Sequence, residues 1–457
     1  MIRSKVVFGA VLAAGALAGG GCGSGGASPV VMVIDQGIDL GASDLQGKVA
    51  ASYTETCIDQ SSGGGSDAGA VDGGPSFSTL KQMYIAALSQ PDNSCHLSPG
   101  ISAKPDPLAS VAQLKSRWNA MVRANKIPSE AFSATEIAQL MGPLNAELFG
   151  AFNYHGTATS STVAHENGNV RLVLVERELG SAESLQTNFP CFVQAEIDQV
   201  VELLNDPQVY AAFVNQPAQI DSELADAEAT HHVQIVNESF GAESRETLEM
   251  LQLKYCSSPI DLAAYFTLLD KVTIDHNATI TGPAVLTVQA AGNDGVKIDT
   301  GSDSLSCDLG DPRSLLVGAY NPGSLTQNAF SNYGACVNVY APGQAIVVEY
   351  AGGWLTWASG TSFAAPLTAR YASMTATAPF DPVAARTAIV AKADPTSQFL
   401  PIGLFPSDFF YVPGTQYPEL VVPAAGAKAA PTLRPPSRYE LHRVFGPLNR
   451  LKQLRRS

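Results

Sequence analysis

Ser362 stands in the segment of this sequence with the clearest chemical potential, Ser359-Gly360-Thr361-Ser362-Phe363-Ala364-Ala365-Pro366. It lies between a turn of small residues and a run, 363–377, that has helical spacing. A hydroxyl at that point would sit at a helix N-terminus, where free backbone N–H groups and the helix dipole favour negative charge. Because an attacked carbonyl develops negative charge on its oxygen, the segment suits a serine nucleophile.

A serine nucleophile needs a general base and a group that orients the base. The apolar run 31–34 ends in Asp35, which predicts a buried parallel strand with this acid at its carboxyl edge. The alternative is an aspartate that caps a turn. Asp39 is a weaker candidate, because it lies past the strand.

The sequence has seven histidines, and only His155 is followed by Gly-Thr. It is therefore the candidate general base. The other histidines are expected at the surface or in satisfied structural positions: His96, His165, His231, His232, His276 and His442.

Another buried-strand pattern, 283–291, ends in small residues and Asn293. The Asn293 side-chain amide and the Ser362 backbone N–H could together donate to the oxygen of a tetrahedral intermediate. The run Asn293-Asp294-Gly295 also suits a simple turn, so this segment alone leaves both interpretations open.

These four segments, in the order Asp, His, Asn, Ser, resemble the motifs of the subtilisin-like serine peptidases. The order Asp, His, Ser separates that family from chymotrypsin-like and α/β-hydrolase enzymes. The resemblance covers residues 30–55 and 151 to about 395. It implies a serine endopeptidase in which Asp35 orients His155, His155 is the general base, Ser362 attacks and Asn293 stabilises the oxyanion. No organic cofactor is implied.

The resemblance extends to substrate binding. The run 233–241 looks like the strand whose edge pairs with an extended peptide in this family. It implies a protein or peptide substrate, and the implied substrate-binding residues are Ser239, Phe240, Gly241, Ala291 and Gly292.

The match weakens after His155-Gly156-Thr157. Where the family usually has a second His and a Val-Ala-Gly run, this sequence has Ala158-Thr159-Ser160-Ser161. The replaced His is not catalytic in the family. The departure therefore concerns packing and pocket shape more than the triad.

Alternating strand and helix patterns predict an α/β protein, a subtilisin-like three-layer fold with a mostly parallel central sheet, helices on both faces and helical insertions. Chemical groups are expected at the carboxyl ends of the strands. We divide the chain into a signal peptide (1–21), a flexible tether (22–29), a peptidase domain (30–55 and 151–423), an insertion (56–150) and a Pro-rich basic tail (424–457).

The insertion begins with a Gly/Ser-rich loop and continues with helical patterns. Five apolar residues recur at helical spacing (Val111, Leu114, Trp118, Met121 and Val122), and Ser133 with Glu136 suggests a capping box. The insertion could restrict access to a substrate cleft or simply cover the sheet, and the second is favoured. Further helices are predicted at 192–204 and 259–271, the latter within an expansion at 242–283, and a strand is predicted at 170–175.

The N-terminal segment reads as an export signal. Arg3 and Lys5 precede an apolar run, 6–17, that is too short to span a membrane, and small residues lead to Cys22. This pattern resembles a bacterial lipoprotein signal, which would make Cys22 a lipid-bearing anchor in an outer or cell-surface membrane. The alternative is a secreted or periplasmic protein without the lipid.

Six further cysteines remain after Cys22: Cys57, Cys95, Cys191, Cys256, Cys307 and Cys336. An even number in an exported chain indicates disulfides, and six allow fifteen pairings. We guess that Cys57 pairs with Cys95. The spacing shows no zinc pattern, so we expect no metal cluster. Calcium is common in the family, and the Asp-rich loop 299–311 offers only unassigned candidate ligands.

The formal net charge of −15 argues against nucleic acid as a partner. We expect a monomer. From Lys428 onward the tail is basic, and Leu448, Leu451 and Leu454 are among its apolar residues at near-helical spacing. It could form an amphipathic segment that touches a membrane or partner, but its prolines favour a disordered, solvated tail.

A second function class remains open, a catalytically inactive peptidase scaffold that acts as a surface binding protein. The altered segment after His155, and the short stretch between Cys22 and Asp35, which leaves little room for a folding propeptide, favour it. The presence of all four chemical residues argues for the enzyme.

Overall fold

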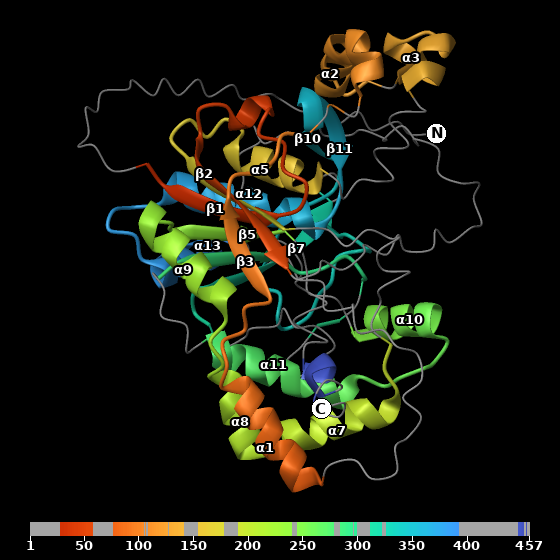
Figure 1. Ribbon diagram of the computed structural model, residues 1–457. Helices are drawn as coiled ribbons and strands as arrows, with labels where there is room; N and C mark the ends of the chain where they lie inside the picture. The colour runs from red at the N-terminus through yellow and green to blue at the C-terminus, as the bar shows by residue number, and fades with distance from the viewer. Residues whose placement is uncertain are drawn as a thin grey trace, which may run out of the picture.

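The computed structural model of this chain is shown in Figure 1. It describes residues 28–57, 76–104, 106, 108–126, 128–140, 154–177, 191–239, 245–277, 284–295, 297–298, 311–321, 326–392, 447–451 and 454.

A nine-stranded sheet forms the centre of the molecule. Its strands are β1 (Val30–Asp35), β2 (Val49–Cys57), β3 (Cys95–Pro99), β4 (Arg171–Arg177), β5 (Ile235–Glu238), β6 (Leu286–Ala290), β7 (Ser314–Asn321), β8 (Thr326–Gln327) and β9 (Val339–Pro342). The order is β3-β2-β4-β1-β5-β6-β7-β8, and β9 also pairs with β7. Antiparallel pairs among these strands are β2 with β3 and β7 with β8, and all others are parallel. The predicted mostly parallel sheet is confirmed.

Helices cover both faces of this sheet. Successive side chains of a strand point to opposite faces, and in β1 Val31 and Val33 join a core that includes residues of α5 (His155–Ala164), α12 (Thr361–Thr375) and α13 (Pro382–Lys392). Met32 and Ile34 join a second core with residues of α9 (Gln219–His231). The three predicted layers are therefore present.

The chain order of the strands places a switch point beside β1. The chain fills the sheet on one side of β1 with β2, β3 and β4, and then on the other side with β5 to β9. Ligands of open parallel sheets bind at the carboxyl ends of strands next to such a point. Asp35 is the last residue of β1 and lies at this position.

Residues 108–140 form a helical cap over a separate two-stranded hairpin, as Figure 1 shows. The cap contains η3 (Ala109–Leu114), α2 (Lys115–Arg123) and α3 (Pro128–Ala131), and the hairpin consists of β10 (Ile346–Tyr350) and β11 (Trp354–Ala358). The five apolar residues predicted to share a helix face are all buried in the core between cap and hairpin. The capping box is also present, since Glu136 accepts from the Ser133 N–H at 2.9 Å and Ser133 Oγ accepts from the Glu136 N–H at 3.4 Å.

Polar contacts add to this packing. The Trp118 indole donates to the Leu355 carbonyl at 2.8 Å, and Asn119 Nδ2 donates to the Gly353 carbonyl at 2.8 Å. Tyr154 belongs to the same core and packs edge-on against Tyr350, with ring centroids 5.4 Å apart. The cap thus contacts both the hairpin that precedes Ser362 and the residue that precedes His155.

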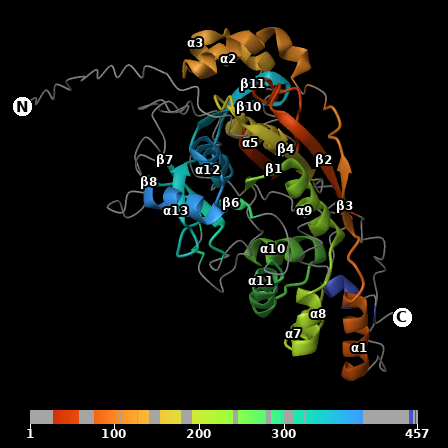
Figure 2. The same cartoon turned by 90° about the vertical axis from the view of Figure 1, so that its left-hand side faces the viewer.

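A helical lobe with its own hydrophobic core lies at the other end of the molecule (Figure 2). It is built from α1 (Phe77–Leu88), α7 (Gln194–Leu204), α8 (Pro207–Val214), α10 (Arg245–Cys256), α11 (Ala263–Asn277) and the helical residues 447–451. The helices predicted at 192–204 and 259–271 correspond to α7 and α11. The described parts of the 56–150 insertion therefore have three locations, because α1 enters this lobe, α2 enters the cap and β3 extends the central sheet. The prediction of a loop with helices alone is wrong in this respect, since β3 pairs with β2.

The prediction of a solvated tail is wrong for the described part of the tail. Leu448 and Leu451 are fully buried in the core of the helical lobe. The Tyr84 hydroxyl donates to the Pro447 carbonyl at 2.9 Å, and Arg450 donates to Gln216 at 3.2 Å. The apolar stripe of this segment covers a core of its own chain, and one arginine lies at the rim.

Two disulfides join described cysteines. Cys57 is bonded to Cys95, as guessed, across a directly paired position of β2 and β3. Cys191 is bonded to Cys256 and ties the start of the α7 segment to the end of α10. Cys336 is also disulfide-bonded. Cys22 lies outside the described residues.

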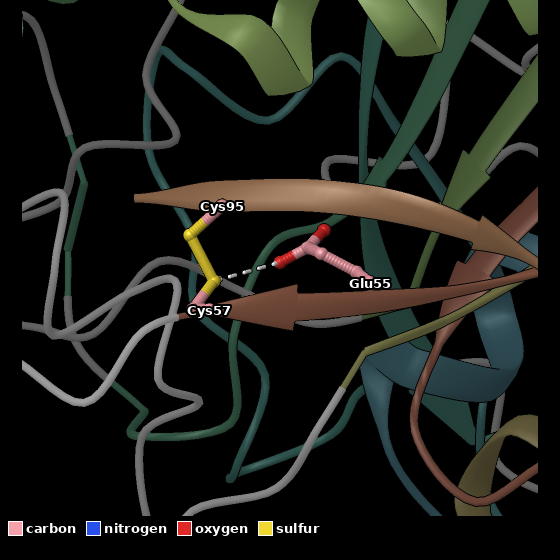
Figure 3. Close-up of side chains that lie close together, drawn as sticks. All are labelled: Glu55, Cys57 and Cys95. Carbon is pink, nitrogen blue, oxygen red and sulfur yellow. Dashed lines mark hydrogen bonds between the residues drawn. A yellow bond between two sulfur atoms is a disulfide. The ribbon is translucent and has the colours of Figure 1, made fainter. Parts of the chain in front are cut away.

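The buried carboxylate of Glu55 lies beside the Cys57–Cys95 bond, as Figure 3 shows. These three residues have the composition of a metal site, but the two sulfur atoms are bonded to each other and are not thiolates. Glu55 is instead paired with buried Arg177 at 2.9 Å. In the described part of the chain, no helix has the length and apolar character needed to cross a membrane.

Candidate active site

Asp35 presents a buried carboxylate at the end of β1. Its Oδ1 accepts from the Gln36 N–H at 2.7 Å and from His155 Nδ1 at 2.8 Å, and its Oδ2 accepts from the Thr159 hydroxyl at 2.7 Å. Burial alone would raise the pKa of Asp35, but the charge and hydrogen bond of His155 and the bonds from Thr159 and Gln36 outweigh it and hold the pKa below its usual value. The group is therefore a carboxylate at neutral pH.

His155 is the first residue of α5, and its neighbours lock the start of this helix to the loop after Asp35. The Gly156 N–H donates to the Gln36 carbonyl at 2.5 Å, and the Thr157 N–H donates to the Gly37 carbonyl at 3.1 Å. A Cβ at Gly156 would lie 2.6 Å from Ile38 Cγ1 and 2.7 Å from the Gln36 oxygen, so a larger residue cannot fit. This explains the glycine in the His-Gly-Thr sequence.

The contact with Asp35 also sets the tautomer of His155. A carboxylate only accepts, so Nδ1 carries the proton, and the lone pair that can accept a proton is on Nε2. The side chain is 14 % exposed, which leaves a small part of the ring open to a substrate.

Ser362 is the second residue of α12 and is 8 % exposed. Gly360, which precedes this helix, has φ 152° and ψ 158°, a conformation that essentially only glycine adopts. The ring of Phe363 packs against the His155 ring with centroids 5.6 Å apart. The residue after the predicted nucleophile thus contacts the predicted base.

Asn293 follows β6 and lies next to the start of α12. Its Oδ1 accepts from the Thr361 N–H at 2.8 Å and from the Thr361 hydroxyl at 3.1 Å, so its Nδ2 remains available as a donor. A Cβ at Gly360 would be 3.5 Å from Asn293 Nδ2 and 3.6 Å from the Ser362 nitrogen. Two N–H donors therefore flank the space that Gly360 leaves open.

Asn332 holds the backbone that carries Asn293. Its Nδ2 donates to the Ala291 carbonyl at 2.9 Å and its Oδ1 accepts from the Asp294 N–H at 3.1 Å. The backbone N–H groups of Ala291 and Gly292 are engaged by the Val317 carbonyl and the Thr361 hydroxyl. The predicted substrate contacts of Ala291 and Gly292 would therefore need groups other than these N–H donors.

Of the remaining predicted substrate residues, Ser239 directly follows β5. Ser239 is buried, and its hydroxyl accepts from Asn237 Nδ2 at 2.7 Å. Phe240 and Gly241 lie outside the described residues, as does nearly all of the loop 299–311 that was considered for calcium.

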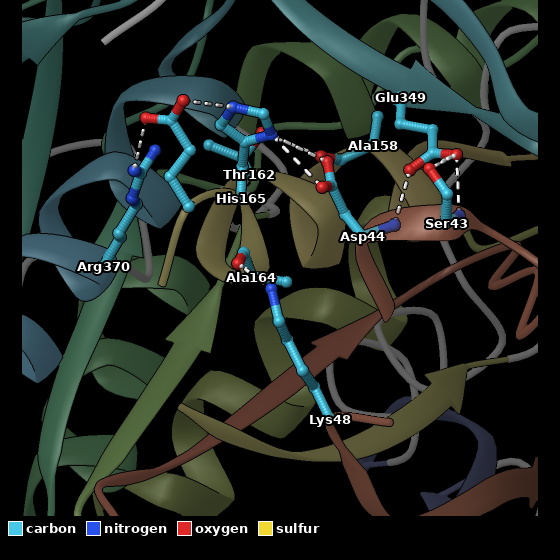
Figure 4. A network of polar contacts seen from close by, with 10 residues as sticks. Ser43, Asp44, Lys48, Ala158, Thr162, Ala164, His165, Glu349 and Arg370 are labelled. Carbon is cyan, nitrogen blue, oxygen red and sulfur yellow. Dashed lines mark hydrogen bonds and ion pairs between the residues drawn. The ribbon is translucent and has the colours of Figure 1, made fainter. Parts of the chain in front are cut away.

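A polar network at the other end of α5 fixes this helix relative to α12, as Figure 4 shows. His165 Nδ1 pairs with Asp44 at 3.0 Å, and Glu166 lies 3.7 Å from buried Arg370 of α12. Glu349 of β10 accepts from the backbone N–H groups of Ser43 and Asp44 at 2.7 and 2.8 Å. His165 has a structural partner, as expected, and so do His231 and His276.

Three further residues of the site were not predicted as such: Thr159, Asn332 and Thr361. Thr361 belongs to the Ser362 motif, and Asn332 lies within the stretch 151 to about 395 that the family resemblance covers; these were the available sequence signals. Thr159 lies in the segment where the match weakens. Its position four residues after His155 puts it on the same helix face, a spacing that the sequence does show.

A buried carboxylate, a histidine and a serine at a helix N-terminus, on a parallel sheet with helices on both faces, are the groups that a serine hydrolase requires. The sequence profile of the subtilase family, peptidase S8, matches residues 26–406. The chain belongs to this family, and the family resemblance noted in the sequence is confirmed.

Curated relatives match over a short segment. A subtilisin-like protease of Coccidioides posadasii is 43 % identical over 86 residues, which are 18 % of this chain and 20 % of the relative. Alkaline protease 1 of Aspergillus clavatus is 40 % identical over 84 residues, 18 % of this chain and 19 % of the relative. The chain thus matches about a fifth of the length of these proteins.

Solved structures that resemble this chain share less sequence identity with it than these relatives do. A cold-adapted subtilisin-like serine proteinase shares 15 % identity over 80 % of this chain and 82 % of its own, with a TM-score of 0.36. A PatG macrocyclase domain shares 15 % identity over 80 % and 83 %, with a TM-score of 0.39.

Proposed function

We propose that this subtilase is an active serine endopeptidase. The observation that carries the proposal is the 2.8 Å contact between buried Asp35 and His155 Nδ1, with the His155 ring packed against the residue that follows Ser362. Family membership supports the general activity, and this geometry supports the assignment of roles.

In the proposed reaction Ser362 Oγ attacks the carbonyl carbon of a peptide bond, and His155 Nε2 accepts the hydroxyl proton. The carbonyl electron pair moves to the oxygen. As the intermediate collapses, the C–N bond breaks and the amine leaves with the proton from His155. Water then attacks the acyl-Ser362 ester, gives one proton to His155, and displaces Ser362, which regains that proton.

Asp35 holds the imidazole in the required tautomer and stabilises the imidazolium that forms twice in each cycle. The Asn293 amide and the Ser362 N–H would donate to the oxyanion. No step of this sequence requires a cofactor. Because β1 and β6 already pair with the two edges of β5, a peptide substrate would bind beyond the carboxyl end of β5, next to Ser239.

We also propose that this protein is exported from the cytoplasm. The disulfides of the described residues are typical of proteins in oxidising compartments. Lipid attachment at Cys22 remains a proposal from sequence, and a Cys22→Ser variant that stayed with the membrane fraction would refute it.

A fluorophosphonate probe tests the catalytic proposal, with the adduct located by mass spectrometry. We expect a single adduct on Ser362 that is lost in Ser362→Ala and strongly slowed in His155→Ala. Ser359→Ala, which changes a serine three positions away, should still be labelled. A natively folded protein that gives no adduct and does not cleave casein would instead be a binding scaffold.

A further inference from the structure

Thr159 makes a contact that the established family assignment does not explain. Its hydroxyl lies 2.7 Å from Asp35 Oδ2, on the oxygen that His155 does not use. Thr159 is fully buried, and it is the single donor to Oδ2 among the residues that the structure describes. The contact occurs in the segment where the sequence departs from the usual run of the family.

The geometry follows from helix spacing. Residues four apart on a helix lie on one face, and His155 and Thr159 are such a pair at the start of α5. One helix therefore holds both oxygens of one carboxylate, Oδ1 through the imidazole and Oδ2 through the hydroxyl. The Gln36 N–H also donates to Oδ1, so without Thr159 the contacts would hold Oδ1 alone. The Thr159 contact on Oδ2 restricts rotation of the carboxylate plane more than contacts on one oxygen would.

The hydroxyl proton of Thr159 has two acceptors within reach. The Gly156 carbonyl is at 3.2 Å and Asp35 Oδ2 is at 2.7 Å. The charged acceptor at the shorter distance makes the stronger bond. A valine has the same shape but no donor, and it would leave a buried carboxylate oxygen without this partner.

We propose that Thr159 is a positioning residue of the peptidase, which fixes the Asp35 carboxylate so that its other oxygen is directed at His155. This inference rests on the proposed function. Thr159 does not touch substrate, and it acts through Asp35 alone.

Within the residues described, the hydrogen bonds of Glu176 and Asp39, two other acidic groups near the loop after Asp35, do not involve the Asp35 carboxylate. Glu176 accepts from the Ile38 N–H at 2.8 Å and pairs with Lys104 at 2.8 Å. Asp39 accepts from the Gly352 N–H at 2.9 Å. A substitution of Thr159 would therefore alter mainly the contact between Asp35 and His155.

The test compares the parent with Thr159→Val and Thr159→Ser on a chromogenic peptide over a range of pH. We expect Thr159→Val to lower kcat about tenfold with KM unchanged. The reason is that the Asp35 carboxylate would be held less firmly in the transition state of the variant than in that of the parent. The acid limb of kcat/KM should also shift relative to the parent, because the Thr159 hydroxyl no longer bonds to the Asp35 carboxylate that faces His155. Thr159→Ser retains a hydroxyl donor and should therefore keep the parent's kcat and the parent's pH profile of kcat/KM.

A second measurement does not depend on turnover. The titration of His155, followed by nitrogen-15 NMR in the parent, in Thr159→Val and in Thr159→Ala, reports the coupling even if no peptide is cleaved. A parent that hydrolyses nothing, with a His155 titration that still moves in the variants, would refute the proposed function and keep the positioning role. An unchanged kcat and an unchanged His155 titration in both folded variants would overturn the role of Thr159.

Discussion

At the scale of single residues, two threonine hydroxyls hold two of the proposed catalytic groups. Thr361 binds the carboxamide oxygen of Asn293, and Thr159 binds the far oxygen of Asp35. In each case the contact fixes the atom that does not take part in the chemistry. The reactive atom is thereby directed without being blocked.

Substitution of Asn293 tests this arrangement. We expect Asn293→Ala to lower kcat by about 100-fold or more with little change in KM, because the lost donor serves the transition state more than the bound substrate. Steady-state kinetics and a fluorophosphonate titration of active sites would measure it. Asn205→Ala, at an exposed asparagine of the helical lobe, should keep full activity, and a fully active Asn293→Ala enzyme would remove Asn293 from the site.

The residue roles differ in how far sequence could reveal them. Asp35, His155, Asn293 and Ser362 stand in short motifs whose order is diagnostic, so they could be selected without coordinates. The bond from Thr159 depends on where α5 lies relative to β1, a distance between elements 120 residues apart. No local pattern encodes that distance, although the i,i+4 spacing from His155 is compatible with it.

At the scale of elements, the helical cap is held by its own local signals as well as by the hairpin. Glu136 accepts from the Ser133 N–H and hydroxyl, both at 2.9 Å, and it also pairs with Arg117 of α2. One carboxylate thus begins a helix and joins it to α2. The capping box was predictable because it is local, whereas the partner on α2 was not.

The ionisation of Glu136 should be visible in stability. The Ser133 N–H, then Arg117 and the Ser133 hydroxyl, lower the pKa of Glu136 from an ordinary 4.5 to about 2. A depressed pKa in the folded state stabilises the fold above the unfolded-state pKa, and this contribution is lost as pH falls from about 4.5 towards 2. We expect the melting temperature of Glu136→Gln to lie below that of the parent at pH 6, with a smaller gap at pH 3.

The matched control is Glu202→Gln, which makes the same substitution at an exposed glutamate on α7 and should change the melting temperature little at pH 6. A gap for Glu136→Gln that stays constant from pH 6 to pH 3 would contradict the assigned ionisation.

At the scale of the whole molecule, the subtilase sheet carries two additions on different sides. The cap contacts Tyr154 and the β10–β11 hairpin, next to the proposed base and nucleophile, and the helical lobe collects helices from four separate stretches of the chain. The central sheet was predictable, since each parallel strand is a local apolar run. The lobe was not, because its helices come together only through contacts between remote segments.

The tail shows the same limit. Its prolines and arginines argued for solvation, and its leucines argued for an amphipathic helix. The helical lobe that buries Leu448 and Leu451 is formed by residues more than 170 positions earlier in the sequence. Likewise, the Cys191–Cys256 bond was one of many pairings that the count of cysteines allowed.

Loss of these leucines should weaken the lobe. We expect Leu448→Ala with Leu451→Ala to lower the melting temperature clearly, since each buried leucine replaced by alanine typically costs about 2–5 kcal/mol. Differential scanning calorimetry would show whether the lobe then melts separately from the sheet. Leu253→Ala, at a 54 % exposed position of α10, should change little, and an equal effect of both substitutions would argue against the packing of the tail.

The position of Leu448 and Leu451 in the chain also orders events during translation. Every strand of the sheet, and α13 after them, leaves the ribosome before these two leucines are made. Because domains generally fold as they emerge, the peptidase core can form while the core of the lobe still has an open groove. A nascent chain arrested after α13 would expose that groove to chaperones or to other nascent chains, and synthesis of the final helix would close it.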